Sequence, residues 1–329
     1  MIFMDSIFSS VFDLARKELN KPLSVVVVGQ TGTGKSSLLN SLFNAGFQTS
    51  DIAPCTKEVQ EVAAFNDKGE KIIFYDMPGI GESTDADSHY LSLYADRLAV
   101  ADIVLWTVHC DSRSVVFDMA SLGKILSTFE SNITKAQIIR KLTIVLTKAD
   151  TLYTPAWIYV IDGDSGYFAP SKQINDIFYR KEEYFQYCFY EPFADLLKTK
   201  IDLKEQLLIN SNDLDFYYEG SHLFYKGFLS KSRLETLVNR YPSLTPTFNS
   251  IYEDFRVITV SAKFRFNLTL LLKLILRKMS GDAAFRFGKY LQDGRLGKMP
   301  FKDIKEFGNI IVFDRHTENV LYNLSDFMI

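Results

Sequence analysis

Short apolar runs alternate with helical patterns along most of this chain. The runs are rich in β-branched residues and have the length of buried strands in a parallel sheet. They are LSVVVVG at 23–29, DIVLWTVH at 102–109, KLTIVL at 141–146 and RVITVSA at 256–262. Helical patterns stand between or behind them, at 90–100, 117–129 and 264–279. This alternation predicts an α/β fold with a doubly wound, mostly parallel sheet.

The N-terminal residues 1–21 carry apolar side chains at helical spacing, which predicts an amphipathic helix. We expect this helix to pack against the rest of the chain; the alternative is a peripheral contact with a membrane. No transmembrane segment is predicted. The apolar stretch at 268–276 is shorter than the roughly 20 residues that a bilayer crossing requires, and it contains Lys273.

The predicted α/β domain consists of residues 22–150 and 256–290. Between these parts lies an aromatic-rich segment, 151–255, which is too long for a structureless loop in a compact domain. We expect a helical insertion there, with a main helix at 176–200 and a shorter one at 232–241. Its aromatic residues form a small core, a surface for a protein partner or a stacking surface for RNA, and the sequence does not choose among these. Residues 291–329 are predicted to form a C-terminal accessory segment.

Composition narrows the class of protein. The net charge of −3, with Lys and Arg scattered in short groups, argues against a protein whose whole surface binds nucleic acid, although a local basic face remains open. Cys55, Cys110 and Cys188 are few and far apart, which indicates neither a disulfide framework nor a metal site and favours a reducing cytoplasm. The four histidines are isolated, and Cys110 beside His109 is interpreted as structural.

A glycine-rich segment directly follows the first predicted strand. It runs Gly29, Gln30, Thr31, Gly32, Thr33, Gly34, Lys35, Ser36, Ser37. The spacing fits G-x-x-x-x-G-K-[ST], in which backbone amides hold phosphates, the lysine reaches the outer phosphates and the serine hydroxyl binds Mg²⁺. The helix that begins near Lys35 adds its positive end. A glycine-rich turn that only tightens packing is the alternative, and the lysine and serine disfavour it.

Further polar residues follow a predicted hairpin. Two apolar runs flank the turn signal Asn66–Gly69, and the second run ends at Asp76-Met77-Pro78-Gly79. Asp76 is expected to orient a water on Mg²⁺, and the Gly79 amide to donate to a γ-phosphate. Thr56 is the hydroxyl placed to complete the Mg²⁺ shell and to order its loop while the γ-phosphate is present.

Two more motifs point to the base of a nucleotide. Guanine presents two adjacent N–H donors that one carboxylate can accept, so Asp150 in Thr147-Lys148-Ala149-Asp150 is the predicted guanine selector. Lys148 is expected to lay its aliphatic stem over the base. After the last predicted strand, the backbone amides of Ser261, Ala262 and Lys263 are candidates to donate to guanine O6, and a helix start capped by Ser261 is the alternative.

Taken in order, these segments resemble the five signature motifs of P-loop GTPases of the translation-factor-related, Era-like group. DIAPCTKEVQEV, IIFYDMPGIGES and YLSLYADRLAVADIVLWTVHCDSR look most similar to bacterial proteins described as 50S-ribosome-binding GTPases of the YfjP type. The resemblance covers about residues 22–150 and 256–263. It implies binding of GTP and GDP with Mg²⁺, hydrolysis of GTP, a cycle between an ordered and a relaxed state, and a ribosomal partner.

The chain departs from this pattern at the catalytic position. Ile80 stands where Ras-like proteins carry the glutamine that orients the attacking water, so intrinsic hydrolysis should be slow. Gly32 stands where potassium-dependent relatives usually carry an asparagine. Glu82 is a candidate to contact the water, and Arg113 a candidate arginine finger supplied in trans; a solvated loop carboxylate and a surface salt bridge are the respective alternatives. Thr147 replaces the usual asparagine of the guanine motif.

Two functions follow from these motifs. The first is a GTP-hydrolysing switch with slow intrinsic turnover, stimulated by a partner or by self-association into a homodimer across the nucleotide face. The partner would be a protein or ribosomal component that contacts 151–255. The rival is an assembly or membrane-scaffold protein of the septin or dynamin kind, in which GTP holds an interface and hydrolysis is incidental. An ATPase is disfavoured, because the motifs at 147–150 and 261–263 would then have no role.

Overall fold

The computed structural model describes most of the chain. The described residues are 22–43, 59–65, 71–80, 87–113, 115–152, 157–201, 215–278, 294–307 and 310–323. The predicted N-terminal helix at 1–21 and the predicted turn at Asn66–Gly69 lie outside these ranges.

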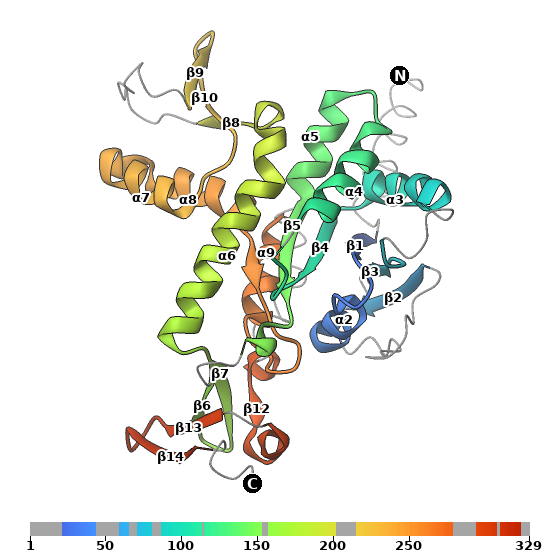
Figure 1. Ribbon diagram of the computed structural model, residues 1–329. Coiled ribbons are helices and arrows are strands. Elements are labelled where there is room, and N and C mark those ends of the chain that lie inside the picture. The colour runs from blue at the N-terminus through green and yellow to red at the C-terminus, as the bar shows by residue number, and fades with distance from the viewer. Residues whose placement is uncertain are drawn as a thin grey trace, which may run out of the picture.

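A six-stranded sheet forms the centre of the molecule (Figure 1), with the order β11-β5-β4-β1-β3-β2. Its strands are β1 (Leu23–Gly29), β2 (Gln60–Phe65), β3 (Lys71–Asp76), β4 (Ile103–His109), β5 (Leu142–Thr147) and β11 (Ile258–Thr259). All neighbours are parallel except β2, which pairs antiparallel with β3. The doubly wound, mostly parallel fold is therefore confirmed, as is the pairing of the two runs of the predicted hairpin.

Helices cover both faces of this sheet. The valine side chains of β1 point alternately to the two faces and so reach both sets of helices. Val25 and Val27 pack in the core beneath α2 (Lys35–Phe43) and α9 (Leu268–Lys278). Val26 and Val28 face the opposite core, because successive side chains of a strand point to opposite faces. The helices of that second face are α3 (Asp87–Val100), α4 (Val116–Ser127), α5 (Asn132–Lys141) and α6 (Lys172–Tyr190).

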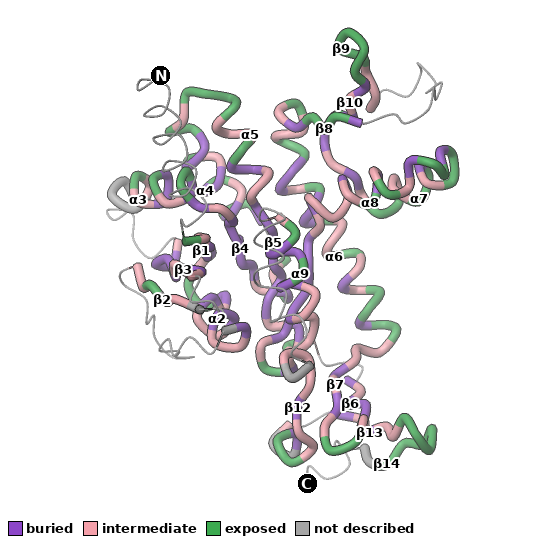
Figure 2. The backbone as a smooth tube through the Cα atoms, turned by 180° about the vertical axis from the view of Figure 1, so that it is seen from behind, coloured by how far each residue is buried: buried purple, intermediate pink, exposed green. Residues whose placement is uncertain are grey.

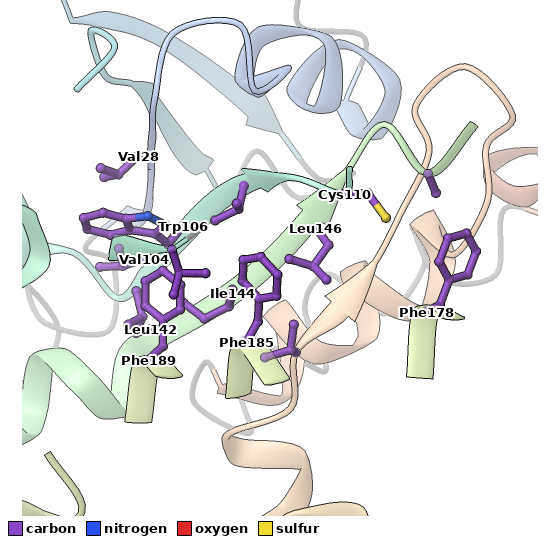
Figure 3. Packing of buried hydrophobic residues seen from close by; sticks show 14 of the residues in the cluster. Val28, Val104, Trp106, Cys110, Leu142, Ile144, Leu146, Phe178, Phe185 and Phe189 are labelled. Carbon is purple, nitrogen blue, oxygen red and sulfur yellow. The ribbon is translucent and has the colours of Figure 1, made fainter. Parts of the chain in front are cut away.

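Helix α6 is the main helix of the predicted insertion, yet it belongs to the core of the central sheet. Figure 3 shows Phe185 and Phe189 of α6 beside side chains of β4 and β5. The ring centroids of Phe189 and Trp106 are 6.0 Å apart. The helix ends at Tyr190 rather than near residue 200, because Pro192 lacks the N–H that a continuing helix requires.

The prediction of a purely helical insertion is wrong. After α6 come a short 3₁₀ helix, η2 (Glu191–Leu196), and a three-stranded sheet of β8 (Lys198–Ile201), β10 (His222–Lys226) and β9 (Phe216–Glu219). Helices α7 (Lys231–Arg240) and α8 (Thr245–Asp254) pack on this sheet around Leu223, Tyr225 and Phe248. Aromatic residues suit strands as well as helices, so their abundance did not decide the type of element.

A five-stranded sheet, called the second sheet below, joins two distant parts of the chain. It has the order β12-β7-β6-β13-β14, with β6 (Trp157–Asp162) and β7 (Ser165–Ala169) before α6. The C-terminal segment supplies β12 (Met299–Pro300), β13 (Ile310–Asp314) and β14 (Asn319–Asn323). Because β13 pairs parallel with β6, the predicted accessory segment is built into the first part of the predicted insertion. In Figure 2 this sheet and the β8-β10-β9 sheet lie toward opposite ends of α6.

Aromatic side chains attach the second sheet to the loop that follows β11. Trp157 packs edge-on against Phe264 and Phe266, with ring centroids 5.2 and 5.1 Å apart, and Phe168 stacks on Phe264 at 4.2 Å. The loop at 261–267 therefore rests on side chains from residues a hundred positions earlier. In the described part of the chain, no helix has the length and apolar character needed to cross a membrane.

Candidate nucleotide site

The glycine-rich segment forms a tight loop between β1 and α2. A Cβ atom on Gly29 would lie 2.3 Å from the carbonyl oxygen of Thr107, so only glycine fits this close approach. Gly32 and Gly34 have φ angles of +78° and +85°, which disfavour other residues, and the space around Gly32 is open. Lys35 begins α2 and its ammonium reaches back across the loop, 3.1 Å from the carbonyl oxygen of Gly29. This cradle has the shape and donors that a phosphate chain requires.

Buried threonine hydroxyls hold the loop against the neighbouring strands. The hydroxyls of Thr33 and Thr107 lie 2.8 Å apart, and Thr107 donates to the carbonyl oxygen of Val28 at 3.1 Å. The Thr147 hydroxyl lies within hydrogen-bond distance of the carbonyl oxygens of Thr33 and Val108. Thr147, which departs from the usual asparagine, thus still ties the ends of β4 and β5 to the phosphate loop.

The end of β3 lies beside the start of α2. The Ser36 hydroxyl donates to Oδ2 of Asp76, and the Asp76 side chain is fully buried. The Ile80 amide donates to the carbonyl oxygen of Gly29 at 3.2 Å, and the Tyr94 hydroxyl donates to the carbonyl oxygen of Pro78 at 2.6 Å. The structure therefore brings Ser36, Asp76 and the segment up to Gly79 to one side of the loop. Thr56 and Glu82 lie outside the described residues.

The two predicted base motifs meet at the ends of β5 and β11. The Ser261 hydroxyl lies 2.5 Å from Oδ1 of Asp150, and the Ala149 amide donates to the carbonyl oxygen of Val260 at 3.0 Å. Lys148 has a φ of +55°, and its aliphatic stem lies alongside Gly34 of the phosphate loop. Asp150 is thereby oriented by a partner from a motif 111 residues away.

Ser261 does not cap an α-helix, which was the alternative prediction. Its hydroxyl accepts the Phe264 amide at 3.0 Å and so closes a turn, whereas α9 begins only at Leu268. Ala262 is half-buried, and Lys263 is exposed with its ammonium 5.0 Å from the centroid of the Phe307 ring. The loop therefore keeps a non-helical backbone beside Asp150.

A buried carboxylate that no sequence motif revealed is hydrogen-bonded to Gln30 of the phosphate loop. Asp118 on α4 is 1% exposed; its Oδ2 accepts from Nε2 of Gln30 at 2.6 Å, and its Oδ1 accepts from Nε1 of Trp106 at 2.9 Å. Burial raises the pKa of Asp118, while the two hydrogen bonds oppose that rise. The only sequence signal was an acidic residue in the first turn of a helix, which usually reflects the helix dipole.

Arg113 lies at the surface of the protein. It is exposed after the end of β4 and lines a surface hollow together with residues of α6. Nearby Cys110 is fully buried, and burial raises the pKa of its thiol to about 12, which agrees with a structural role. Among the described residues, no group of histidines, cysteines and carboxylates has the arrangement of a metal-binding cluster.

Comparisons with known proteins cover the first part of this site. Residues 24–148 match the family model described as 50S ribosome-binding GTPase. The proteins YkfA and YfjP of Escherichia coli K12 are 39% and 37% identical to the chain over 94 residues, which are 28% of this chain and 32% of each relative. The matching region therefore spans about a third of the length of these curated relatives.

Among solved structures, Era in complex with MgGDPNP and 16S ribosomal RNA nucleotides matches with 17% identity. The match covers 78% of this chain and 57% of that one, with a TM-score of 0.41. The family match begins within β1 and ends at Lys148 of the first base motif, so it includes the phosphate loop, Asp76 and the strands that position them. Residues 24–148 of this chain are thus similar to the GTPase domain that the 50S ribosome-binding GTPase family model describes.

Proposed function

We propose that this protein binds guanine nucleotides with Mg²⁺ and hydrolyses GTP to GDP and phosphate as a molecular switch. One observation carries the proposal: the phosphate loop, Asp76 and Asp150 stand at the same edge of one sheet, each at the end of a different parallel strand. Ligands of open α/β sheets bind at this edge. The matched relatives share only part of their length with the chain, so its substrate and partners are inferred from the residues themselves.

The oxygens of Ser36 and Asp76 fit a magnesium ion. A hydroxyl and a carboxylate lie in contact beside the phosphate loop, and both are hard oxygen ligands of the kind that Mg²⁺ prefers. When bound, Mg²⁺ would neutralise charge on the phosphates. Thr56, which lies outside the described residues, is proposed to complete the shell.

Asp150 supports a guanine nucleotide over an adenine nucleotide. Its carboxylate is anchored through Oδ1 by the Ser261 hydroxyl, which leaves it oriented as a pair of acceptors for the two adjacent N–H donors of guanine. The stem of Lys148, which already runs beside Gly34, would cover the base and part of the loop.

Slow intrinsic hydrolysis follows from Ile80, whose side chain has no hydrogen-bonding group to orient a water. The backbone of Ile80 is paired with that of Gln30 in the phosphate loop. Ile80 therefore occupies the position beside the loop at which Ras-like proteins carry the catalytic glutamine. Glu82 remains a proposed water contact. Arg113 is exposed and so available to a second subunit, which supports its proposed action in trans within a homodimer. Residues 151–255 remain the proposed contact for a protein or ribosomal partner.

The proposal is tested by the turnover of GTP and of ATP with Mg²⁺. We expect slow GTP-specific turnover, on the order of 10⁻³ s⁻¹ or less without a partner, because Ile80 cannot orient the attacking water. Lys35→Ala should abolish it, since the ammonium that binds the outer phosphates is removed. Phosphate release is measured over a wide range of protein concentration. Equal turnover of ATP, or turnover that survives Lys35→Ala, would contradict the proposal.

Base selection is tested by Asp150→Asn. The variant exchanges one acceptor for an N–H₂ group that faces a guanine donor, so GTP should bind about a hundredfold more weakly, as charge-assisted hydrogen bonds contribute roughly 1.5–3 kcal/mol each. ATP binding should not change. Asp164→Asn, at an exposed turn between β6 and β7, is the matched control for which we expect wild-type affinity. Parallel losses of GTP and ATP affinity in Asp150→Asn would show that the carboxylate does not read the base.

Catalysis across a dimer is tested by Arg113→Ala. This variant should retain GTP affinity and lose the part of the turnover that rises with protein concentration, by about a thousandfold or more if Arg113 acts as an arginine finger. Arg315→Ala removes an exposed arginine from the turn between β13 and β14 and should behave as wild type. If Arg113→Ala retains the concentration dependence, Arg113 has no part in catalysis.

The Gln30–Asp118 contact is tested by a double-mutant cycle. Asp118→Asn leaves one donor of Gln30 or Trp106 facing an amide N–H₂, and the phosphate loop should shift, with a loss of GTP affinity of about tenfold. Gln30→Ala should cause a similar loss, and the double variant should lose no more than either single variant. Affinities are measured beside thermal melting of each variant. Fully additive losses would show that the two residues act separately.

A further inference from the structure

A surface hollow of about 340 Å³ lies between the segment after β4 and helix α6. We call it the α6 hollow; Arg113 lines it from the first element, and Ile177, Arg180, Lys181, Tyr184 and Phe185 line it from the second. The α6 residues recur at intervals of three and four, so they form one stripe of the helix. The stripe lies within 151–255, the proposed contact for a protein or ribosomal partner, and the inference below rests on that proposal and specifies its ligand.

Positive charge gathers around the α6 hollow. Arg113 and Arg180 are exposed, and the ion pairs formed among the described residues use other cations. Lys181 donates one N–H to the carbonyl oxygen of Ser112 at 3.0 Å, which fixes its ammonium at the edge of the hollow and leaves two N–H donors. The site therefore attracts an anion, and its arginines suit the oxygens of a phosphate.

The neighbouring acidic groups do not cancel this charge. Asp111 is exposed two residues before Arg113, and Asp176 precedes Arg180 by one turn of α6. Glu182 is directed away from the hollow, because it accepts the Thr259 amide at 2.9 Å, and Glu183 contacts the Ser232 amide at 3.4 Å. Neither Asp111 nor Asp176 lines the hollow, whereas three cations do.

An aromatic face accompanies the charge. Tyr184 is 49% exposed and lines the hollow together with the apolar side chains of Ile177 and Phe185. A half-exposed ring beside guanidinium groups is the combination on which bases of a single strand stack while their phosphates are held. A duplex buries its base faces and cannot use such a ring.

We propose that the α6 hollow binds single-stranded RNA, with phosphates held by Arg180 and Lys181 and one base stacked on Tyr184. The segment that carries Arg113 is linked to the nucleotide site, because the Cys110 amide donates to the carbonyl oxygen of Thr147 at 2.8 Å. The α6 hollow, and RNA bound in it, would thus lie next to the base end of the nucleotide site. This binding does not depend on GTP hydrolysis.

The test uses the full chain without nucleotide and a fluorescein-labelled oligouridine of about a dozen nucleotides, followed by fluorescence anisotropy at several salt concentrations. Tyr184→Ala should weaken binding about tenfold, in line with the removal of one stacked base. Arg180→Glu should weaken it at least as much and lower the salt slope by about 0.7 for each phosphate that the variant no longer holds. Arg113 is left unchanged because of its proposed catalytic role.

Matched controls come from the same helix. Tyr187→Ala removes a tyrosine that is 59% exposed but does not line the hollow, and Lys172→Glu removes an exposed cation at the start of α6; both should bind RNA as wild type does. Equal losses in controls and test variants, or no loss in any variant, would overturn the proposal. So would equal affinity for a duplex of the same length, or displacement of the RNA by a phosphotyrosine peptide at lower concentration than by unlabelled oligouridine.

Discussion

The phosphate loop is held in shape by buried threonine hydroxyls. Thr33 within the loop, Thr107 near the end of β4 and Thr147 at the end of β5 are each almost fully buried, so their hydroxyls must find partners inside the protein. They find them in one another and in the carbonyl oxygens of Val28, Thr33 and Val108. Removing one would strand other buried polar groups at a cost of about 1–3 kcal/mol each. The loop is therefore organised by the protein itself, before any phosphate binds.

The same preorganisation extends to both ends of the proposed nucleotide site by different means. At the phosphate end, the side chain of Gln30 is tied to buried Asp118, which couples the loop to α4 and to Trp106 of the sheet. At the base end, Ser261 orients Asp150, and the turn that carries Ser261 rests on Trp157 and Phe168 of the second sheet.

Helix α6 connects these parts. Its apolar face completes the core of the central sheet through Phe185 and Phe189, and its N-terminal half packs on the second sheet through Phe178 and Trp157. The adjoining stripe, which shares Phe185 with the buried face, lines the α6 hollow. Burial on one side fixes the helix, and this rigidity is what allows Arg180 and Tyr184 to present a phosphate-binding and stacking surface on the other.

The sequence by itself determined the central sheet, the phosphate loop, Asp76 and the two base motifs. These features depend on local chemistry, because β-branched runs form buried strands, closely spaced glycines permit the loop, and polar residues follow strand ends. Only the tertiary structure decided that the C-terminal strands pair with β6, that α6 joins the central core and that Asp118 supports Gln30. The reason is physical: strand pairing and buried hydrogen bonds join residues that are far apart in sequence. The residues around Asp118 and Ile310 form no local pattern from which Gln30 or Trp157 could be predicted as the partner.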